Sequence, residues 1–429
     1  MTADRSIAPP HAQDIRPAGA DATPPAPRQP QGRNPPAARL ALALTGGGAR
    51  AAYQVGCLRF IAREFPDFQP RILTGVSAGA INAAHLASSA KSMREAVQRL
   101  EALWLSMQTS KVYRIDARSL VGHLFGWAGR LLSGGSEFAP RMRGMVDTTP
   151  LRKFLGSHLP HDAGGVMSQI STNIAQGRLD AVAISTTSYA SGRSITWVQG
   201  ADLERYERRD RSAQRTELTV EHVMASAALP MFFPAVNIDG CWHGDGGVRL
   251  TAPLSPALHL GATKILAVSP RYLAPAGPSA ADRDSHYPTP ARIAGVLMNA
   301  VFLDMLDHDE LQMRRINDLI RRTPPEQRSD MRNIEVLILR PSRDLGALAG
   351  QYEVRLPRLF RFLERGFGTR QSRSADALAM VMFEHEYLKR LIDLGEQDTA
   401  ARREEIGAFL YEEADASATM SPRPARRLT

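Results

Sequence analysis

The chain has 429 residues and a net charge of +9, with 43% hydrophobic and 23% charged residues. This composition fits a globular protein with one large domain and extensions, or with two domains. The positive charge comes mainly from scattered arginines, which argues against a nucleic-acid-binding arm. It fits either attraction to an anionic lipid surface or an ordinary solvated surface.

The two cysteines, Cys57 and Cys241, exclude a disulfide framework and indicate a reducing compartment. No Cys or His cluster has zinc spacing, so no metal site is expected. Residues 1–38 are rich in proline and alanine and are predicted to be disordered. They do not resemble a secretory signal, and no stretch reaches the roughly 18 apolar residues of a membrane span. We therefore expect a cytoplasmic protein, with peripheral membrane contact left open.

The first ordered element is a buried strand at 40–44, followed by a loop with three adjacent glycines, Gly46, Gly47 and Gly48, and a helical pattern at 51–62. Such a loop can present its amides to an anion. One interpretation is a dinucleotide fingerprint, but that fingerprint needs an acidic residue at the end of the second strand, and none stands there. The other is an oxyanion hole for acyl transfer. A plain glycine-rich turn is the third alternative.

A second motif, Gly75-Val76-Ser77-Ala78-Gly79, follows the apolar run 72–73 and precedes a helical run at 80–87. Strand, sharp turn and helix are the context in which Gly-x-Ser-x-Gly forms a nucleophile elbow. Gly75 and Gly79 leave room where a Cβ would collide with neighbouring backbone. Ser77 would lie at the amino end of the helix, where the dipole favours negative charge. The alternative is a tight turn with a capping serine.

Together, the loop Thr45–Arg50 and the motif around Ser77 resemble the opening of the patatin-like phospholipases. The resemblance implies an acyl hydrolase with a Ser–Asp dyad and an Asp-Gly-Gly or Asp-Gly-Ala motif downstream. Arg50 is expected to support the oxyanion loop by bonding its backbone or offsetting charge; an exposed arginine is the alternative. The family usually has glycine after this arginine, where this chain has Ala51, which would strain the loop if the position needs a positive φ.

The middle of the chain is predicted to contain a helix at 92–108, a helix with Thr149 as its N-cap and Pro150 in its first turn, and strands at 179–185 and 194–198. The apolar stretch 120–132 suggests either a buried helix or a mobile cover that contacts a bilayer. Residues 204–215 are densely charged and are predicted to form a solvated loop or helix face. A helix at 221–230 carries the family-like phrase Ala-Ser-x-x-x-Pro-x-x-Phe-Pro.

The downstream motif appears directly after a predicted hairpin at 236–242, as His243-Gly244-Asp245-Gly246-Gly247. In the family the aspartate of this motif is the base, so the resemblance assigns that role to Asp245. Gly246 and Gly247 would let the backbone pass close to the elbow. Alone, the motif could be a simple turn. A Ser–Asp–His triad through His259 is the alternative to the dyad.

The C-terminal third is predicted to hold strands at 264–268 and 334–339, a long helix from 293 and mostly helical structure over 354–394. We expect a disordered segment at 1–38, a catalytic domain at 39–272, a helical extension packed on that domain at 273–411, and a disordered tail at 412–429.

The predicted fold is an α/β/α sandwich with a mainly parallel central sheet and the site at the carboxyl ends of its strands. The predicted function is hydrolysis of a phospholipid or lysophospholipid acyl ester without metal or organic cofactor. The expected partner is a lipid substrate rather than a nucleic acid. A dinucleotide-binding protein and a non-catalytic membrane-associated scaffold remain as alternatives. Head-group preference and oligomeric state do not follow from the sequence.

Overall fold

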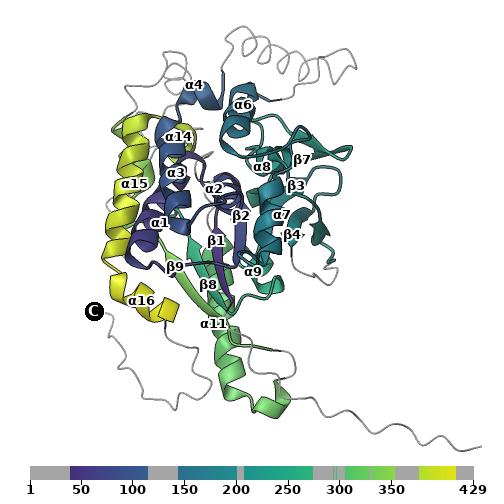
Figure 1. Cartoon of the computed structure of the whole chain (residues 1–429), viewed down its shortest axis with the longest axis vertical. Helices are drawn as coiled ribbons and strands as arrows, with labels where there is room; N and C mark the ends of the chain where they lie inside the picture. Colours follow the sequence, from purple (N-terminus) through teal and green to yellow (C-terminus); the bar gives the residue numbers. More distant parts are fainter. Residues whose placement is uncertain are drawn as a thin grey trace, which may run out of the picture. The chain divides into compact units, whose positions relative to one another are not determined.

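A computed structural model describes residues 39–114, 144–200, 207–273, 305–328, 331–352 and 376–411, together with the single residues 293 and 296 (Figure 1). The predictions for residues 1–38, for the apolar stretch 120–132, for residues 354–375 and for the tail lie outside these residues.

The central sheet has the strand order β5-β4-β3-β2-β1-β8-β9, and a β6–β7 hairpin joins it through β3. Neighbouring strands from β3 to β9 along this order run parallel, whereas β4 and β7 run antiparallel to β3. The predicted mainly parallel sheet is therefore confirmed. The strands are β1 (Leu40–Leu44), β2 (Ile72–Val76), β3 (Ala181–Ser188), β4 (Ser194–Gly200), β5 (Arg211–Arg215), β6 (Val236–Ile238), β7 (Cys241–Asp245), β8 (Lys264–Val268) and β9 (Glu335–Leu339).

Helices cover both faces of this sheet (Figure 1). The helices are α1 (Ala52–Glu64), α2 (Ala78–Ala87), α3 (Met93–Ser106), α4 (Thr109–Val112), α6 (Thr149–His158), α7 (Ser168–Ala175), α8 (Val220–Ser226), α9 (Ser255–His259), α11 (Met305–Arg322), α12 (Leu345–Gly350), α14 (Asp376–Val381), α15 (His385–Ala400) and α16 (Arg403–Tyr411). Short 3-10 turns are η1 (Gly48–Ala51), η2 (Gly246–Val248) and η4 (Pro325–Gln327).

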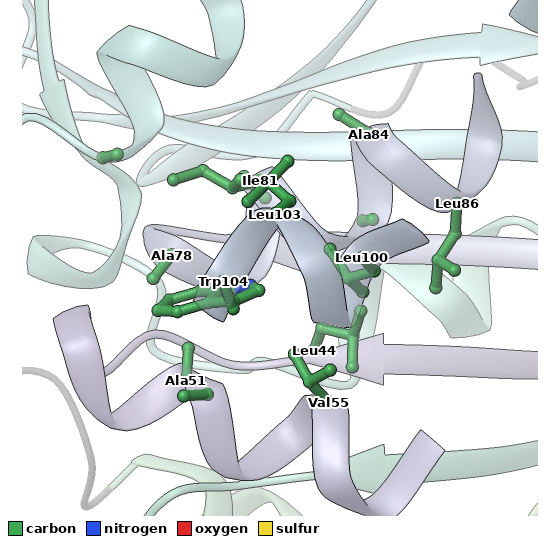
Figure 2. Packing of buried hydrophobic residues seen from close by; sticks show 14 of the residues in the cluster. Leu44, Ala51, Val55, Ala78, Ile81, Ala84, Leu86, Leu100, Leu103 and Trp104 are labelled. Carbon is green, nitrogen blue, oxygen red and sulfur yellow. The ribbon is translucent and has the colours of Figure 1, made fainter. Parts of the chain in front are cut away.

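The alternation of side chains along β1 explains the layers. Leu42 and Leu44 belong to the core that α1, α2, α3 and α15 cover, whereas Ala41 and Ala43 belong to the core under α9 and α11. Figure 2 shows the first core, where Leu44 lies close to Val55 and Leu100. Because successive strand residues point to opposite faces, one buried strand serves two cores, which gives the predicted three-layer sandwich.

One predicted element is wrong. The charged segment 204–215 was expected to be a solvated loop or helix face, but β5 (Arg211–Arg215) is a strand paired in parallel with β4. It lies at the edge of the sheet and its side chains are exposed or half-buried. An edge strand needs no apolar alternation, so the sequence carried no strand signal. A smaller difference is that Thr148, not Thr149, occupies the N-cap of α6.

The region beyond residue 272 contributes to the sheet as well as to its helical cover. Strand β9 pairs in parallel with β8, and α15 packs along α1. The two helices approach closely at Gly56, where a Cβ would lie 1.8 Å from the carbonyl oxygen of Ile392. The guanidinium of Arg59 also forms ion pairs with Asp393 and Glu396 of α15. Among the described helices, none is long and apolar enough to cross a bilayer.

Candidate active site

Ser77 is the residue between β2 and α2, and its backbone has φ 57° and ψ −130°. Non-glycine residues seldom adopt a positive φ, so surrounding contacts must hold this turn. A Cβ at Gly75 would lie 2.6 Å from the Gly79 carbonyl oxygen, and a Cβ at Gly79 would lie 2.2 Å from that of Leu44. Both glycines therefore permit the strand and the helix to meet at this sharp angle.

A serine of α8 fixes the backbone of this elbow. The amide of Ser77 donates to the hydroxyl oxygen of Ser226 (2.9 Å), and that hydroxyl donates to the carbonyl of Ser185 in β3 (2.7 Å). Ser226 is completely buried. The bond therefore satisfies an amide that the strained turn leaves without a strand or helix partner. It connects elements that are distant in the sequence.

The hydroxyl of Ser77 donates a hydrogen bond directly to Asp245 Oδ2 at 2.6 Å. The other carboxylate oxygen, Oδ1, accepts from the amide of Gly247 at 2.8 Å. Strand pairing of β7 with β3 positions the backbone, where Thr187 donates to the Asp245 carbonyl (2.8 Å) and the Asp245 amide donates to Ala228 (2.9 Å). No other side chain stands between the hydroxyl and the carboxylate.

Burial raises the pKa of Asp245 to about 7, and the hydrogen bonds from Ser77 and Gly247 oppose that rise. The carboxyl group is completely buried, so its ionised form loses solvation by water. A carboxylate with a pKa near 7 is a far stronger base than one in water, and it accepts a proton from a hydroxyl more readily.

The glycine loop passes directly beside Ser77. A Cβ at Gly46 would lie 2.9 Å from Ser77 Cβ and 3.5 Å from Ser77 Oγ. In the described part of the chain, no backbone carbonyl accepts a hydrogen bond from the amide of Gly46 or Gly47. Gly48 has φ +56°, a conformation that favours glycine. The loop can therefore approach the hydroxyl closely with amides available to an oxyanion.

Arg50 and Ala51 follow the loop within η1. Arg50 is buried, and its amide donates to the Gly47 carbonyl at 3.2 Å. Ala51 has φ −66° and ψ −10°, which is helical. Alanine causes no strain there, so the departure from the family pattern is conformationally harmless.

A buried hydrogen-bond network of polar side chains, which was not predicted from the sequence, holds the start of the glycine loop. Trp104 Nε1 donates to Asn82 Oδ1 (2.7 Å), and Asn82 Nδ2 donates to Gln54 Oε1 (2.8 Å). Gln54 Nε2 then donates to the carbonyls of Thr45 (2.8 Å) and Val268 (3.1 Å). Each of these polar groups is satisfied, so the network connects α3, α2 and α1 to the start of the glycine loop. No local motif reveals it, because its members are separated by 22 to 28 residues.

Two histidines have other surroundings: His259 of the alternative triad and His243, which precedes Asp245 in β7. His259 ends α9 and borders a pocket with Ser194 and Arg211 of β4 and β5. Burial and nearby arginines lower its pKa. His243 Nδ1 lies 3.1 Å from Thr186 Oγ1. Neither histidine lies between the Ser77 hydroxyl and the Asp245 carboxylate, which are directly hydrogen-bonded. Among the residues described here, no group of three or more His, Cys, Asp or Glu side chains could hold a metal ion.

An apolar pocket opens beside Ser77. Its total empty volume, including the open mouth, is about 480 Å³. The side chains around it are hydrophobic apart from Ser77, and they come from α2, α3, α4, α6, the segment after α8 and the end of α14. They include Ile81, Trp104, Met107, Val112, Leu151, Leu229, Phe233, Met380, Val381 and Phe383. Pockets of this kind bind apolar ligands and use few polar groups for orientation.

Three solved structures are similar to this chain at low identity. They are human GIVD cytosolic phospholipase A2 in complex with methyl gamma-linolenyl fluorophosphonate (12% identity, TM-score 0.42, 86% of this chain and 58% of that chain), VipD from Legionella pneumophila (10%, 0.32, 86% and 67%) and the type III effector protein ExoU (13%, 0.32, 86% and 53%). The chain thus spans 58% of the length of the human enzyme. No curated protein sequence matches it significantly.

A family model for patatin-like phospholipases matches residues 42–258, just over half of the chain. The match includes the glycine loop, the elbow and the Asp-Gly-Gly motif, and it agrees with the resemblance found from these motifs. The chain belongs to the patatin-like phospholipase family.

Proposed function

We propose that Ser77 and Asp245 form a catalytic dyad that hydrolyses the acyl esters of phospholipids or lysophospholipids through an acyl-enzyme. The observation that carries this proposal is the direct 2.6 Å hydrogen bond from Ser77 Oγ to a completely buried carboxylate. A serine hydroxyl is a poor nucleophile until a base removes its proton, and this carboxylate is within reach to do so.

In the first half-reaction, Ser77 Oγ attacks the ester carbonyl carbon while its proton moves to Asp245 Oδ2. The electron pair of the carbonyl moves to its oxygen, and collapse of this tetrahedral intermediate breaks the bond to the alcohol. The leaving alcohol takes the proton from Asp245. The products are the free alcohol, such as a lysophospholipid, and an ester between the fatty acid and Ser77.

In the second half-reaction, water attacks the acyl-enzyme and gives a proton to Asp245. Collapse breaks the bond to Ser77 Oγ, which regains that proton as the fatty acid leaves. Asp245 thus begins and ends each half-reaction ionised, and no other proton carrier is required.

The oxyanion would be held by amides of the glycine loop. Gly46 is adjacent to Ser77, and the amides of Gly46 and Gly47 donate to no described backbone carbonyl. The amide of Ala78 is a further candidate that the sequence analysis did not name. It belongs to the first residue of α2, where helix amides lack an internal partner. Buried Arg50 would add positive charge to the same loop.

The apolar pocket supports a fatty-acyl chain as the part of the substrate bound beside Ser77. Its lining carries no charged side chain, so a lipid head group would remain outside, at the mouth. Transient contact of that mouth with a lipid surface follows from the proposal, because the substrate resides there.

A fluorophosphonate probe tests the dyad. Wild-type protein should be labelled, and Ser77→Ala should lose all labelling. Ser88→Ala is the matched control, because Ser88 is also buried but lies at the far end of α2. Asp245→Asn should fold and yet hydrolyse phospholipid at a rate reduced at least a hundredfold. Retained turnover in Asp245→Asn, or loss of turnover only in His259→Ala, would contradict the dyad.

A further inference from the structure

We propose that the C-terminal strip, defined as Met380–Phe383, forms one wall of the acyl pocket and determines the length of acyl chain that the enzyme accepts. This inference rests on the proposed function, and it assigns a specific role to residues that lie beyond the family match. The strip begins more than a hundred residues after residue 258, where that match ends.

Three side chains of the strip line the pocket that contains Ser77: Met380, Val381 and Phe383. The fourth, Met382, is fully buried but does not line it. Other lining residues, including Ile81 and Trp104, come from inside the family match. An acyl chain bound beside Ser77 would therefore contact both residues of the family match and residues of the C-terminal region.

Hydrogen bonds from α3 and α4 hold the strip in place. Tyr113 donates its hydroxyl proton to the carbonyl of Val381 at 3.0 Å, and Thr109 donates to the carboxylate of Glu384 at 3.1 Å. His385 Nδ1 lies 2.9 Å from the Leu105 carbonyl. Directly after the strip, α15 packs along α1. A wall anchored at several points is fixed in position, so its side chains can select ligands by size.

The strip also contacts the glycine loop through its backbone. A Cβ at Gly48 would lie 2.0 Å from the carbonyl oxygen of Met380 and 2.8 Å from its carbonyl carbon. Only glycine allows the strip to lie this close to the loop. The strip, which would contact the acyl chain, therefore also contacts the glycine loop, which would bind the oxyanion. The position of the strip thus affects the geometry at the reacting carbonyl.

The chemistry of the lining specifies the ligand. The strip presents only thioether, aliphatic and aromatic groups, and each methylene of a chain buried against them favours binding by about four-fold in affinity. A bulkier side chain at Val381 should shorten the pocket and remove such contacts. A smaller side chain at Phe383 should open space for additional methylenes.

The experiment compares kcat/KM for p-nitrophenyl esters of 4, 8, 12 and 16 carbons. Val381→Phe should lower the ratio of the 12-carbon to the 4-carbon ester by at least tenfold. Phe383→Ala should raise the ratio of the 16-carbon to the 12-carbon ester by at least fourfold. Met382→Ala is the matched control: it removes a neighbouring buried side chain and should leave both ratios unchanged. A ratio is independent of the fraction of protein that folds.

The outcomes separate this inference from the proposed function. If Ser77 is labelled by fluorophosphonate and both Val381→Phe and Phe383→Ala keep the wild-type chain-length profile, the inference is overturned and the dyad stands. If Val381→Phe does not fold, Phe383→Ala alone decides. If Met382→Ala changes the ratios as much as Phe383→Ala, the side chains that line the pocket have no specific part in chain-length selection, and the inference is overturned. If wild-type protein hydrolyses no ester, both proposals fail.

Discussion

The hydroxyl oxygen of Ser226 accepts the backbone N–H of Ser77, across 149 residues of sequence. Two residues later, the carbonyl of Ala228 accepts the amide of Asp245. The end of α8 therefore fixes the backbones of both proposed dyad members. This explains how the Ser77 hydroxyl and the Asp245 carboxylate meet at 2.6 Å, although Ser77 follows β2 and Asp245 ends β7.

Replacement of Ser226 by alanine should slow fluorophosphonate labelling about 10- to 100-fold. The strained elbow would lose the acceptor of its buried amide, and an unsatisfied buried donor costs about 1–3 kcal/mol. The effect should appear in kcat with little change in KM, because Ser226 does not line the acyl pocket. The thiol in Ser226→Cys is similar in size to the hydroxyl but is a weak hydrogen-bond acceptor. The labelling rate of this variant should therefore lie between those of wild type and Ser226→Ala. Equal rates for Ser226→Ala and wild type would rule out this positioning role.

The pH dependence of kcat/KM should report Asp245. Burial raises its pKa to about 7, and the ionised form is the proposed base. Activity should therefore increase about tenfold per pH unit below 7 and level off above it. The profile should be measured with a short-chain ester at constant ionic strength. If kcat/KM is constant between pH 5 and 8, Asp245 is not the base.

Asp245→Asn should stabilise the protein at pH 8 while it removes activity. A free aspartate has a pKa of about 3.9, so the folded state binds the proton more tightly than the unfolded state does. The free energy of unfolding of wild type should therefore fall as pH rises from about 4 to about 7. Asparagine avoids this cost, which is on the order of 4 kcal/mol at most. Thermal denaturation should show a higher Tm for the variant at pH 8 and a smaller difference at pH 5; a lower Tm at pH 8 contradicts the expectation.

Gly48→Ala should abolish turnover and lower Tm. The new Cβ would require an unfavourable positive φ of +56° and would collide with the carbonyl of Met380. Gly350→Ala provides a control, because its Cβ would meet no atom within 4 Å and the residue lies in α12. The control should match wild type in activity. If Gly48→Ala is fully active, the contact between the C-terminal strip and the glycine loop is not required for catalysis.

Local signals predicted much of this molecule. The elbow, the hairpin before Asp245 and most strands were visible because glycine, proline and apolar runs specify backbone conformation over a few residues. Strand β5 was missed because an edge position tolerates arginines. The phrase around Ser226 was noted without a role, since its acceptor function depends on a distant amide. Met380 and Phe383 belonged to a region predicted only to be mostly helical, because core and pocket-lining residues have the same composition.

The central claim is that Ser77 carries the acyl group during turnover. Wild-type protein mixed with p-nitrophenyl laurate, quenched in acid within the first turnovers and digested, can be analysed by peptide mass spectrometry. The account predicts a laurate ester on the peptide that contains Ser77, and none in Ser77→Ala. An unmodified Ser77 during rapid turnover with the same adduct on another residue would contradict it.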